Sequence, residues 1–119
     1  MAKKKETIGT GKARTSAAGQ KKMPRVQKKD ALGIVECRGI TAAIEAADSM
    51  VKTANVEVIG SQKIGNALIY TAVIGEVDAV SEAVKAGSET AQRLGELYAA
   101  HVMTRPDDTI FEIIEIISR

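Results

Sequence analysis

The sequence has few bulky or chemically reactive side chains. Its 119 residues include no Trp, one Phe, two Tyr, one Cys and one His. A single cysteine cannot form an internal disulfide, and Cys37 lies in an apolar run, so we expect it to be a small buried side chain. The chain has no second Cys or His with metal-ligand spacing, so we expect neither a metal site nor a cofactor. The scarcity of aromatic residues also limits how much area a lone domain of this size can bury.

Strong candidates for catalysis are missing as well. His101 lies in a strand-like pattern, where a lone histidine is more often a packed or hydrogen-bonded surface residue than a base. Glu36 lies within an apolar run and could act as a general base with a raised pKa. We instead expect Glu36 to pair with a cation such as Arg38 or to contact a neighbouring subunit. The sequence therefore predicts no catalytic residue and no enzymatic activity.

Long hydrophobic runs are absent. No stretch reaches the roughly 18 apolar residues that a transmembrane helix needs. The basic start lacks the apolar region of a secretory signal. We therefore expect a cytoplasmic protein without a membrane partner.

Charge divides the chain into two blocks. Residues 1–29 hold ten Lys and Arg against one acid, a net charge of +9, whereas residues 30–119 carry a net charge of −7. The basic block has too few apolar residues to offset the entropy of ordering, so it is predicted to be a disordered N-terminal extension. Its cations could bind phosphates, but it lacks aromatic residues for base stacking. We therefore favour a solvated segment, or one that docks on an acidic protein face, over nucleic-acid binding.

The remainder, residues 30–119, repeats one pattern twice. Each half reads as an apolar strand, a helix-period segment and a second strand, which is typical of a βαβ-like unit. The predicted fold is α/β: a four-stranded antiparallel sheet with two helices on one face and a short C-terminal helix. The expected strands cover residues 31–37, 56–60, 67–74 and 97–103, and the expected helices cover residues 41–53 and 77–94.

Helical spacing predicts which side chains face the sheet. Thr41 is the expected N-cap of the first helix, and Gly95 is expected to end the second. Asp107 and Asp108 suit the start of a C-terminal helix, although its β-branched residues leave a strand as the alternative. The expected inward stripes are Ile40, Ala43, Ile44, Ala47 and Val51 in the first helix, Val77, Val80, Val84, Gly87, Ala91 and Leu94 in the second, and Ile110, Ile113, Ile114 and Ile117 in the third.

Several short runs, in order and spacing, resemble one known family. They are residues 31–36, Arg38-Gly39, residues 42–48, residues 50–52, residues 54–57, residues 63–65 and Arg105-Pro106. These runs look like the single-domain, hexamer-forming shell protein of bacterial microcompartments. The likeness is specific because it rests on many runs in register rather than on one motif.

The resemblance implies a ferredoxin-like domain that packs six copies into a flat disc. Such hexamers tile into the facets of a protein shell around metabolic enzymes. The implied partners are identical copies, other hexameric, trimeric and pentameric shell proteins, and the encapsulated enzymes. The implied location is a microcompartment shell in the cytoplasm.

The resemblance also implies two sets of functional residues. Lys52, Asn55 and Arg105 match the positions at the hexamer edge that join neighbouring hexamers. Lys63, Ile64, Gly65, Asn66 and Ala67 match the loop that lines a narrow pore on the sixfold axis. The family's usual Gly-Ser-Gly is Gly65-Asn66-Ala67 here. Six Asn amides would make a neutral polar ring, and Ala67 removes the freedom of the second glycine, so a different loop backbone is expected.

Two other classes of function remain open at this stage. One is a small oligomeric ligand-binding regulator on a ferredoxin-like scaffold, with residues 61–66 holding an anion. The other is a nucleic-acid-associated protein that binds through residues 1–29. Oligomer mass and electron microscopy would discriminate among the three classes.

Overall fold

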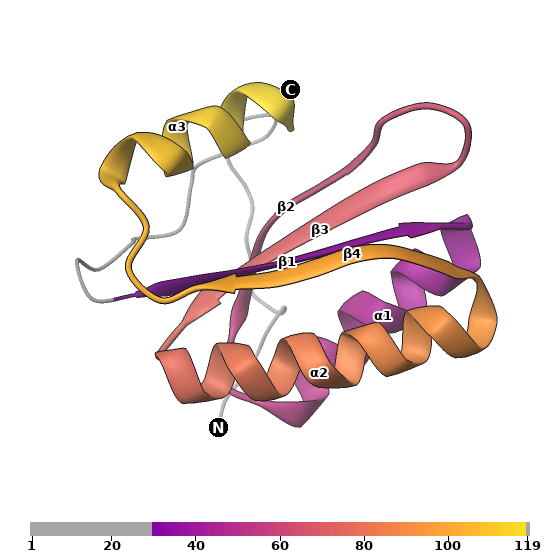
Figure 1. Cartoon of the computed structure of the whole chain (residues 1–119), viewed down its shortest axis with the longest axis horizontal. Helices are drawn as coiled ribbons and strands as arrows, with labels where there is room; N and C mark the ends of the chain where they lie inside the picture. The colour runs from indigo at the N-terminus through magenta and orange to yellow at the C-terminus, as the bar shows by residue number, and fades with distance from the viewer. Residues whose placement is uncertain (1–29, 119) are drawn as a thin grey trace, which may run out of the picture.

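The computed structural model describes residues 30–118 and confirms the predicted fold class. The predicted extension over residues 1–29 lies outside the described residues. Four antiparallel strands form one sheet, two long helices lie on one face, and a third helix lies on the other (Figure 1). The elements are β1 (Ala31–Arg38), α1 (Ile40–Thr53), β2 (Glu57–Lys63), β3 (Leu68–Gly75), α2 (Val77–Leu94), β4 (Glu96–Met103) and α3 (Asp108–Ile117).

The sheet has the strand order β2-β3-β1-β4, so the two βαβ-like halves interleave. β1 and β3 are the central strands and pair from Ala31 opposite Gly75 to Arg38 opposite Leu68. Their central position explains why β3 is buried from Ile69 to Ile74, as its apolar sequence predicts. β2 and β4 are the two edge strands, and β2 runs three residues beyond the predicted end at residue 60.

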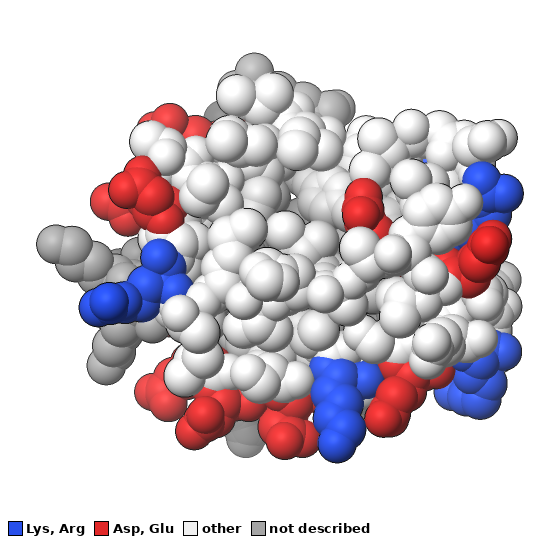
Figure 2. Space-filling view, in the orientation of Figure 1, with Lys and Arg blue, Asp and Glu red and all other residues white. Residues whose placement is uncertain are grey.

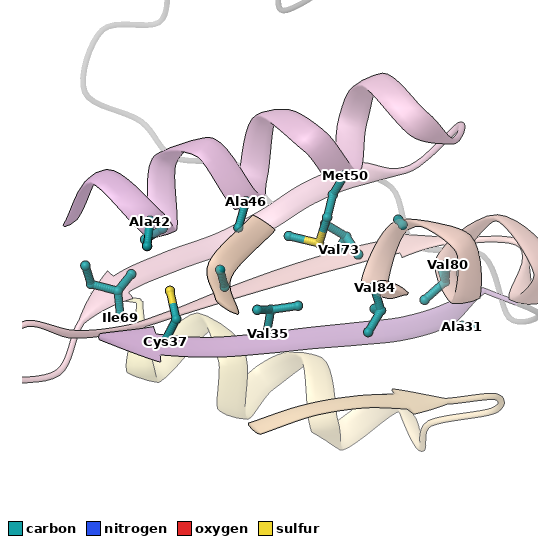
Figure 3. Close-up of a cluster of buried hydrophobic side chains, with 13 residues drawn as sticks. Ala31, Val35, Cys37, Ala42, Ala46, Met50, Ile69, Val73, Val80 and Val84 are labelled. Atoms are coloured by element: carbon teal, nitrogen blue, oxygen red, sulfur yellow. The ribbon is translucent and has the colours of Figure 1, made fainter. Parts of the chain in front are cut away.

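The core between the sheet and the helices is built from small side chains. Ala42, Ala46 and Met50 of α1 face Val35, Val73 and Val80, and all are nearly inaccessible to solvent (Figure 3). A Cβ atom added at Gly87 of α2 would lie 2.7 Å from Met50 Cγ. The small residues thus let α1 and α2 pack closely, and Ser49 Oγ of α1 lies 2.7 Å from Thr90 Oγ1 of α2.

The inward stripe predicted for α1 is wrong in most of its members. The buried residues are Ala42, Ala43, Ala46 and Met50, whereas Ile44 is 65% exposed and Ile40 and Val51 are also exposed. The close approach of α1 to the sheet and α2 leaves room only for small residues and one flexible Met. The predicted cap at Thr41 is also wrong, because Gly39 is the N-cap and no side chain caps the helix.

α2 has the predicted bounds, Val77–Leu94, and ends at Gly95. Val80, Val84, Gly87 and Ala91 are buried as predicted. Val77 and Leu94, at the two ends of the predicted stripe, are exposed instead. The stripe prediction therefore holds through the middle of α2 and fails at its two ends.

α3 covers part of the sheet face that α1 and α2 leave open (Figure 1). Ile114 is buried against Leu32, Tyr70, Ala72 and Ile74, and Ile110 and Phe111 are half-buried beside it. The helix begins as predicted: Asp107 is its N-cap, and the carboxylate accepts a hydrogen bond of 3.1 Å from Thr109 N. Ile113 and Ile117, predicted to face inward, are exposed because the buried face is centred on Ile114.

Candidate functional site

The hairpin loop, residues 63–67, joins edge strand β2 to central strand β3. Lys63 is the last residue of β2, and Ile64, Gly65 and Asn66 are exposed at the tip. Leu68 N donates to Gly65 O at 2.9 Å, which closes a tight turn with Asn66 and Ala67 at its centre. Both central residues have positive φ, 54° and 62°, which is typical of the primed turns that suit the twist of a hairpin.

Ala67 therefore occupies a conformation that favours glycine. Asn66 tolerates positive φ well because its short polar side chain suits the left-handed region, but an alanine there is strained. The backbone holds it in place: Ala67 O accepts a hydrogen bond of 2.9 Å from Gly39 N. The loop is thus fastened to the junction between β1 and α1, and its tip has a defined position at one end of the sheet.

The predicted edge residues lie at the other end of the sheet. Lys52 is in the last turn of α1, Asn55 is in the connection to β2, and Arg105 follows β4, and all three are exposed. This end is where Glu57 pairs with Ile74, where Ala31 pairs with Gly75, and where Leu32 pairs with Met103. The length of the eight-residue strands, about 25 Å, therefore separates the hairpin loop from the three edge residues.

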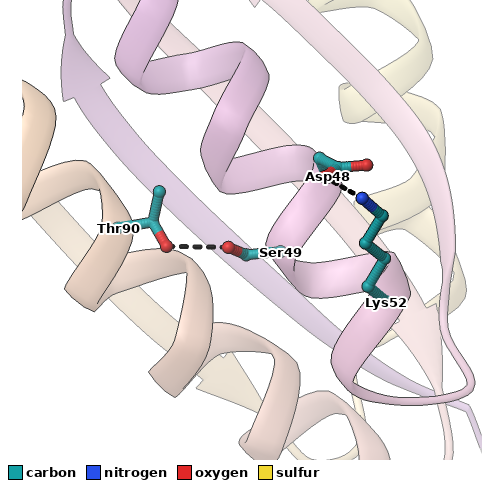
Figure 4. A network of polar contacts seen from close by, with 4 residues as sticks. All are labelled: Asp48, Ser49, Lys52 and Thr90. Atoms are coloured by element: carbon teal, nitrogen blue, oxygen red, sulfur yellow. Dashed lines mark hydrogen bonds and ion pairs between the residues drawn. The ribbon is translucent and has the colours of Figure 1, made fainter.

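Lys52 is held by an ion pair within α1. Its Nζ lies 2.8 Å from Asp48 Oδ2, four residues earlier (Figure 4). The hydrogen bond and charge of Asp48 raise the pKa of Lys52, so its ammonium stays charged. An exposed pair of this kind adds little stability. Its effect is to orient a long, charged side chain along the outside of the helix.

The two edges of the sheet carry different apolar surfaces. Between α1 and edge strand β2 lies a groove of about 380 Å³, lined by Ile40, Ala43, Ile44, Ala47, Ser61, Gln62, Lys63 and Ile69. The opposite edge is β4, where half-exposed Tyr98 is followed by exposed Ala99 and Ala100. Figure 2 shows mostly uncharged side chains over this edge, with charged ones along α2, where α3 begins, and at the end of the molecule that carries the β2–β3 hairpin.

Residue Tyr98 is positioned by an irregularity in β4. The pairing of β1 with β4 shifts between Glu36 and Cys37, and the Arg38 guanidinium lies over the Tyr98 ring at 5.5 Å from its centroid. A bulge of this kind bends an edge strand, and the cation–π contact holds the ring. Sequence reasoning missed this pair, because nothing in the local pattern predicts the bulge.

The candidate catalytic residues do not form a catalytic group. His101 is exposed on β4, and Glu36 is half-buried on β1, opposite Tyr70 and Ala99. No hydrogen bond joins Glu36 to His101 or to Arg38 in the described part of the chain. Cys37 is buried as predicted, and burial raises the pKa of its thiol, which keeps it protonated.

Within residues 30–118, no group of three or more His, Cys, Asp and Glu side chains is placed to hold a metal ion. The helices of this same part of the chain are all too short or too polar to cross a membrane.

The exposed face of α1 is the other feature that sequence reasoning missed. The sequence did carry a signal for it: α1 has small apolar residues on one side and Ile40, Ile44 and Val51 on another. A helix that is apolar on most of its circumference is usually buried on most of it. Within this chain, only the alanine side of α1 is buried against other elements. We therefore expect another molecule to cover the side that carries the isoleucines.

A family model and several known proteins match this chain, and all of them concern microcompartment or carboxysome shell proteins. The family model described as "BMC domain" matches residues 31–106. The chain is 48% identical over 87 residues to the bacterial microcompartment shell protein PduA of Citrobacter freundii, covering 73% of this chain and 94% of that protein. It is 47% identical over 77 residues to the carboxysome shell protein CsoS1 of Prochlorococcus marinus, covering 64% of this chain and 75% of that protein.

A solved structure shares the fold. The crystal structure of a microcompartment protein from Desulfitobacterium hafniense matches with a TM-score of 0.66 and 24% sequence identity. The match covers 76% of this chain and 49% of the other, so the chain spans about half the length of that protein. This likeness supports the fold that the strand order and helix placement describe.

Proposed function

This chain belongs to the BMC domain family of bacterial microcompartment shell proteins, and from that premise we propose that it forms cyclic hexamers that tile into the facets of a microcompartment shell. Its role is structural rather than enzymatic, in keeping with its relatives, which are named as shell proteins. The proposed location is the shell itself. The proposed partners are identical copies, other hexameric, trimeric and pentameric shell proteins, and the enclosed enzymes.

One observation carries the proposal: the hairpin loop and the edge residues lie at opposite ends of the same sheet. If six copies are arranged radially with the loop toward the axis, Lys52, Asn55 and Arg105 fall on the outer rim. A rim that carries exposed polar side chains from each copy can contact the rim of the next ring. The strands then act as spokes of about 25 Å between pore and rim.

The two unlike edges of the sheet support closure of the ring. An interface between the groove at β2 and the exposed side of β4 is heterologous, because each copy uses two different surfaces. Heterologous contacts repeat around an axis and leave no free surface once the ring closes. Burial of Ile40, Ile44 and Tyr98 in this contact would supply the apolar area that the small-residue core lacks.

The hairpin loops would line the pore. The proposed lining residues are Lys63, Ile64, Gly65, Asn66 and Ala67, of which the first four are exposed in the single chain. Asn66 offers both a donor and an acceptor, so six copies would make a neutral, polar ring. We propose that small polar metabolites pass this ring.

The ring interface is tested by Ile44→Glu, with Lys85→Glu on the exposed side of α2 as the control. A carboxylate in the apolar groove should leave a folded monomer, because Ile44 contributes nothing to the core of one chain. Light scattering should report hexamers for the parent and the control and single chains for Ile44→Glu. Hexamers of unchanged stability in Ile44→Glu would refute the interface.

Tiling is tested separately by Lys52→Ala, with Lys85→Ala as the control. Hexamers should persist in both variants. Electron microscopy should show extended sheets for the parent and the control but not for Lys52→Ala. Sheets that form as before would contradict the edge assignment.

The oligomeric state of the parent protein also separates the three classes of function. A trimer that binds a small ligand would favour the ligand-binding regulator, and a monomer that binds DNA at low salt would favour the nucleic-acid-associated protein.

The pore is tested by Asn66→Gly. Glycine suits the positive φ of this position, so the hexamer should form normally while the flux of small polar solutes through assembled shells changes. A collapsed hexamer would instead show that the loop is structural rather than a pore lining.

A further inference from the structure

The outer face of α3 carries two adjacent stripes that nothing in residues 30–118 covers. One stripe is acidic, and the other is apolar. At helical spacing, Asp108, Glu112 and Glu115 form the acidic stripe, and the exposed Ile113, Ile116 and Ile117 form the apolar stripe beside it. The buried side, centred on Ile114, lies on the sheet.

The charge of this face is unbalanced. Residues 107–118 contain four acids and no Lys or Arg, and α3 has no basic residue in its last turn. Like charges three and four residues apart repel each other along a helix. Acidic atoms gather at the side of the molecule where α3 begins (Figure 2). The face is therefore best suited to a cationic partner that also brings apolar side chains.

Residues 21–29 have that composition. The segment Lys-Lys-Met-Pro-Arg-Val-Gln-Lys-Lys holds five cations and no acid, with Met23 and Val26 between them. It is followed by Asp30, the residue before β1, and Leu32 of β1 is in the same cluster as Ile114 of α3. Nine extended residues span up to about 30 Å, and the ten-residue α3 is about 15 Å long. The segment can thus reach the whole of α3 in its own chain.

We propose that residues 21–29 dock on the outer face of α3 of the same chain, with their cations beside Asp108, Glu112 and Glu115 and with Met23 and Val26 against the exposed isoleucines. The segment would bury part of the exposed face of α3, and high salt would weaken the contact because it pairs opposite charges. It does not depend on the proposed ring: either can fail without the other, because neither the groove at β2 nor the hairpin loop takes part.

Zero-length carbodiimide cross-linking of the full chain at low salt, followed by mass spectrometry, locates the contact. The expected products join Lys21, Lys22, Lys28 or Lys29 to Glu112, Glu115 or Asp108. Mixing chains labelled with ¹⁴N and ¹⁵N separates contacts within a chain from those between chains. Cross-links from these lysines to acids elsewhere, cross-links only between chains, or no cross-links at all would overturn the proposal.

Trypsin provides the second measurement. Cleavage within residues 21–29 should be several-fold slower at low salt than at about 1 M salt, where the screening length is about 3 Å. The variant D108N/E112Q/E115Q should remove this protection. The matched control is D78N/E82Q/E89Q on α2, which loses the same charge from an exposed helix and should keep it. Equal cleavage rates in all three proteins would refute the docking.

A charge exchange distinguishes a lost contact from a loss of folding. Reversing two charges of the segment with K28E/K29E should abolish its protection from trypsin. Combining these changes with E112K/E115K in α3 should restore part of that protection. Failure of the combined variant to recover, with α3 still helical by circular dichroism, would also contradict the proposal.

Discussion

At the scale of single residues, Ala67 shows how one side chain can oppose its own backbone. Its φ of 62° lies in the left-handed region, where an L-residue with a Cβ costs about 1–2 kcal/mol. The hydrogen bonds of the turn, together with the bond from Gly39 N to Ala67 O, hold it there. Strain of this kind persists only where the surroundings determine the conformation. In the proposed ring, it would fix the shape of the pore-lining loop.

Ala67→Gly should therefore stabilise the chain. Relief of strain outweighs the added entropy of the unfolded glycine, and the net gain should be about 0.5–1 kcal/mol. Urea unfolding at fixed protein concentration measures it, with Ala79→Gly in helical α2 as the control that should destabilise. A less stable Ala67→Gly variant would show that the loop is not strained.

Cys37 makes a pH-dependent contribution. Burial raises the pKa of its thiol above the ordinary value of 9.0. Above pH 9.0 the unfolded chain loses this proton while the folded chain retains it, so the free energy of unfolding falls as pH rises. The stability of the parent should thus decline more steeply between pH 9 and 10 than that of Cys37→Ala, as measured by urea unfolding. Parallel pH profiles would contradict this.

At the scale of elements, α3 is attached to the sheet through a small contact. Ile114 is 4% exposed, whereas Ile116, two residues later, is 59% exposed. Tyr70 reinforces the attachment: its hydroxyl donates to Ile114 O at 3.4 Å and also contacts the Ser118 hydroxyl. The attachment thus centres on Ile114 and Tyr70, with half-buried Ile110 and Phe111 beside them.

Ile114→Ala should release α3 from the sheet. Loss of the buried side chain should cost about 2–4 kcal/mol, and amide hydrogens of residues 110–117 should exchange faster than those of β1 and β3. Ile116→Ala is the matched control and should change stability by less than about 0.5 kcal/mol. Similar exchange rates in the two variants would show that α3 is held by something other than Ile114.

At the scale of the whole molecule, α1 leaves its large branched side chains outside and packs mostly small ones inside. Ile40, Ile44 and Val51 are exposed on α1, while Ala42 and Ala46 are buried. The core between the sheet and the two long helices is mostly alanine and valine, which bury little area per residue, so part of the available hydrophobic stabilisation lies on the outer surface. Folding and association should therefore be coupled.

The coupling predicts a dependence on concentration. If association stabilises the folded chain, the urea midpoint should rise with protein concentration. In Ile44→Glu the midpoint should be independent of concentration and should lie near the low-concentration limit of the parent. A parent midpoint that does not move over a hundredfold range of concentration would mean that the single chain carries its own stability.

Much of the fold follows from the sequence alone. The repeated strand–helix–strand pattern fixes the four strands and two long helices, because alternation and helical spacing are local properties. Gly95 ends α2 and Asp107 begins α3 for equally local reasons. The resemblance of short runs also indicates the family, which the match over residues 31–106 confirms. The roles of Lys52, Asn55, Arg105 and the hairpin loop stay predictions.

Only the tertiary structure decides which apolar side of α1 is buried, that α3 crosses to the opposite face, and that the hairpin loop and the edge residues lie about 25 Å apart. The sequence of α1 offers two apolar sides, and periodicity favours the larger residues. The limited space between α1, α2 and the sheet selects the smaller ones instead. That choice depends on contacts between segments far apart in the chain, which no local pattern encodes.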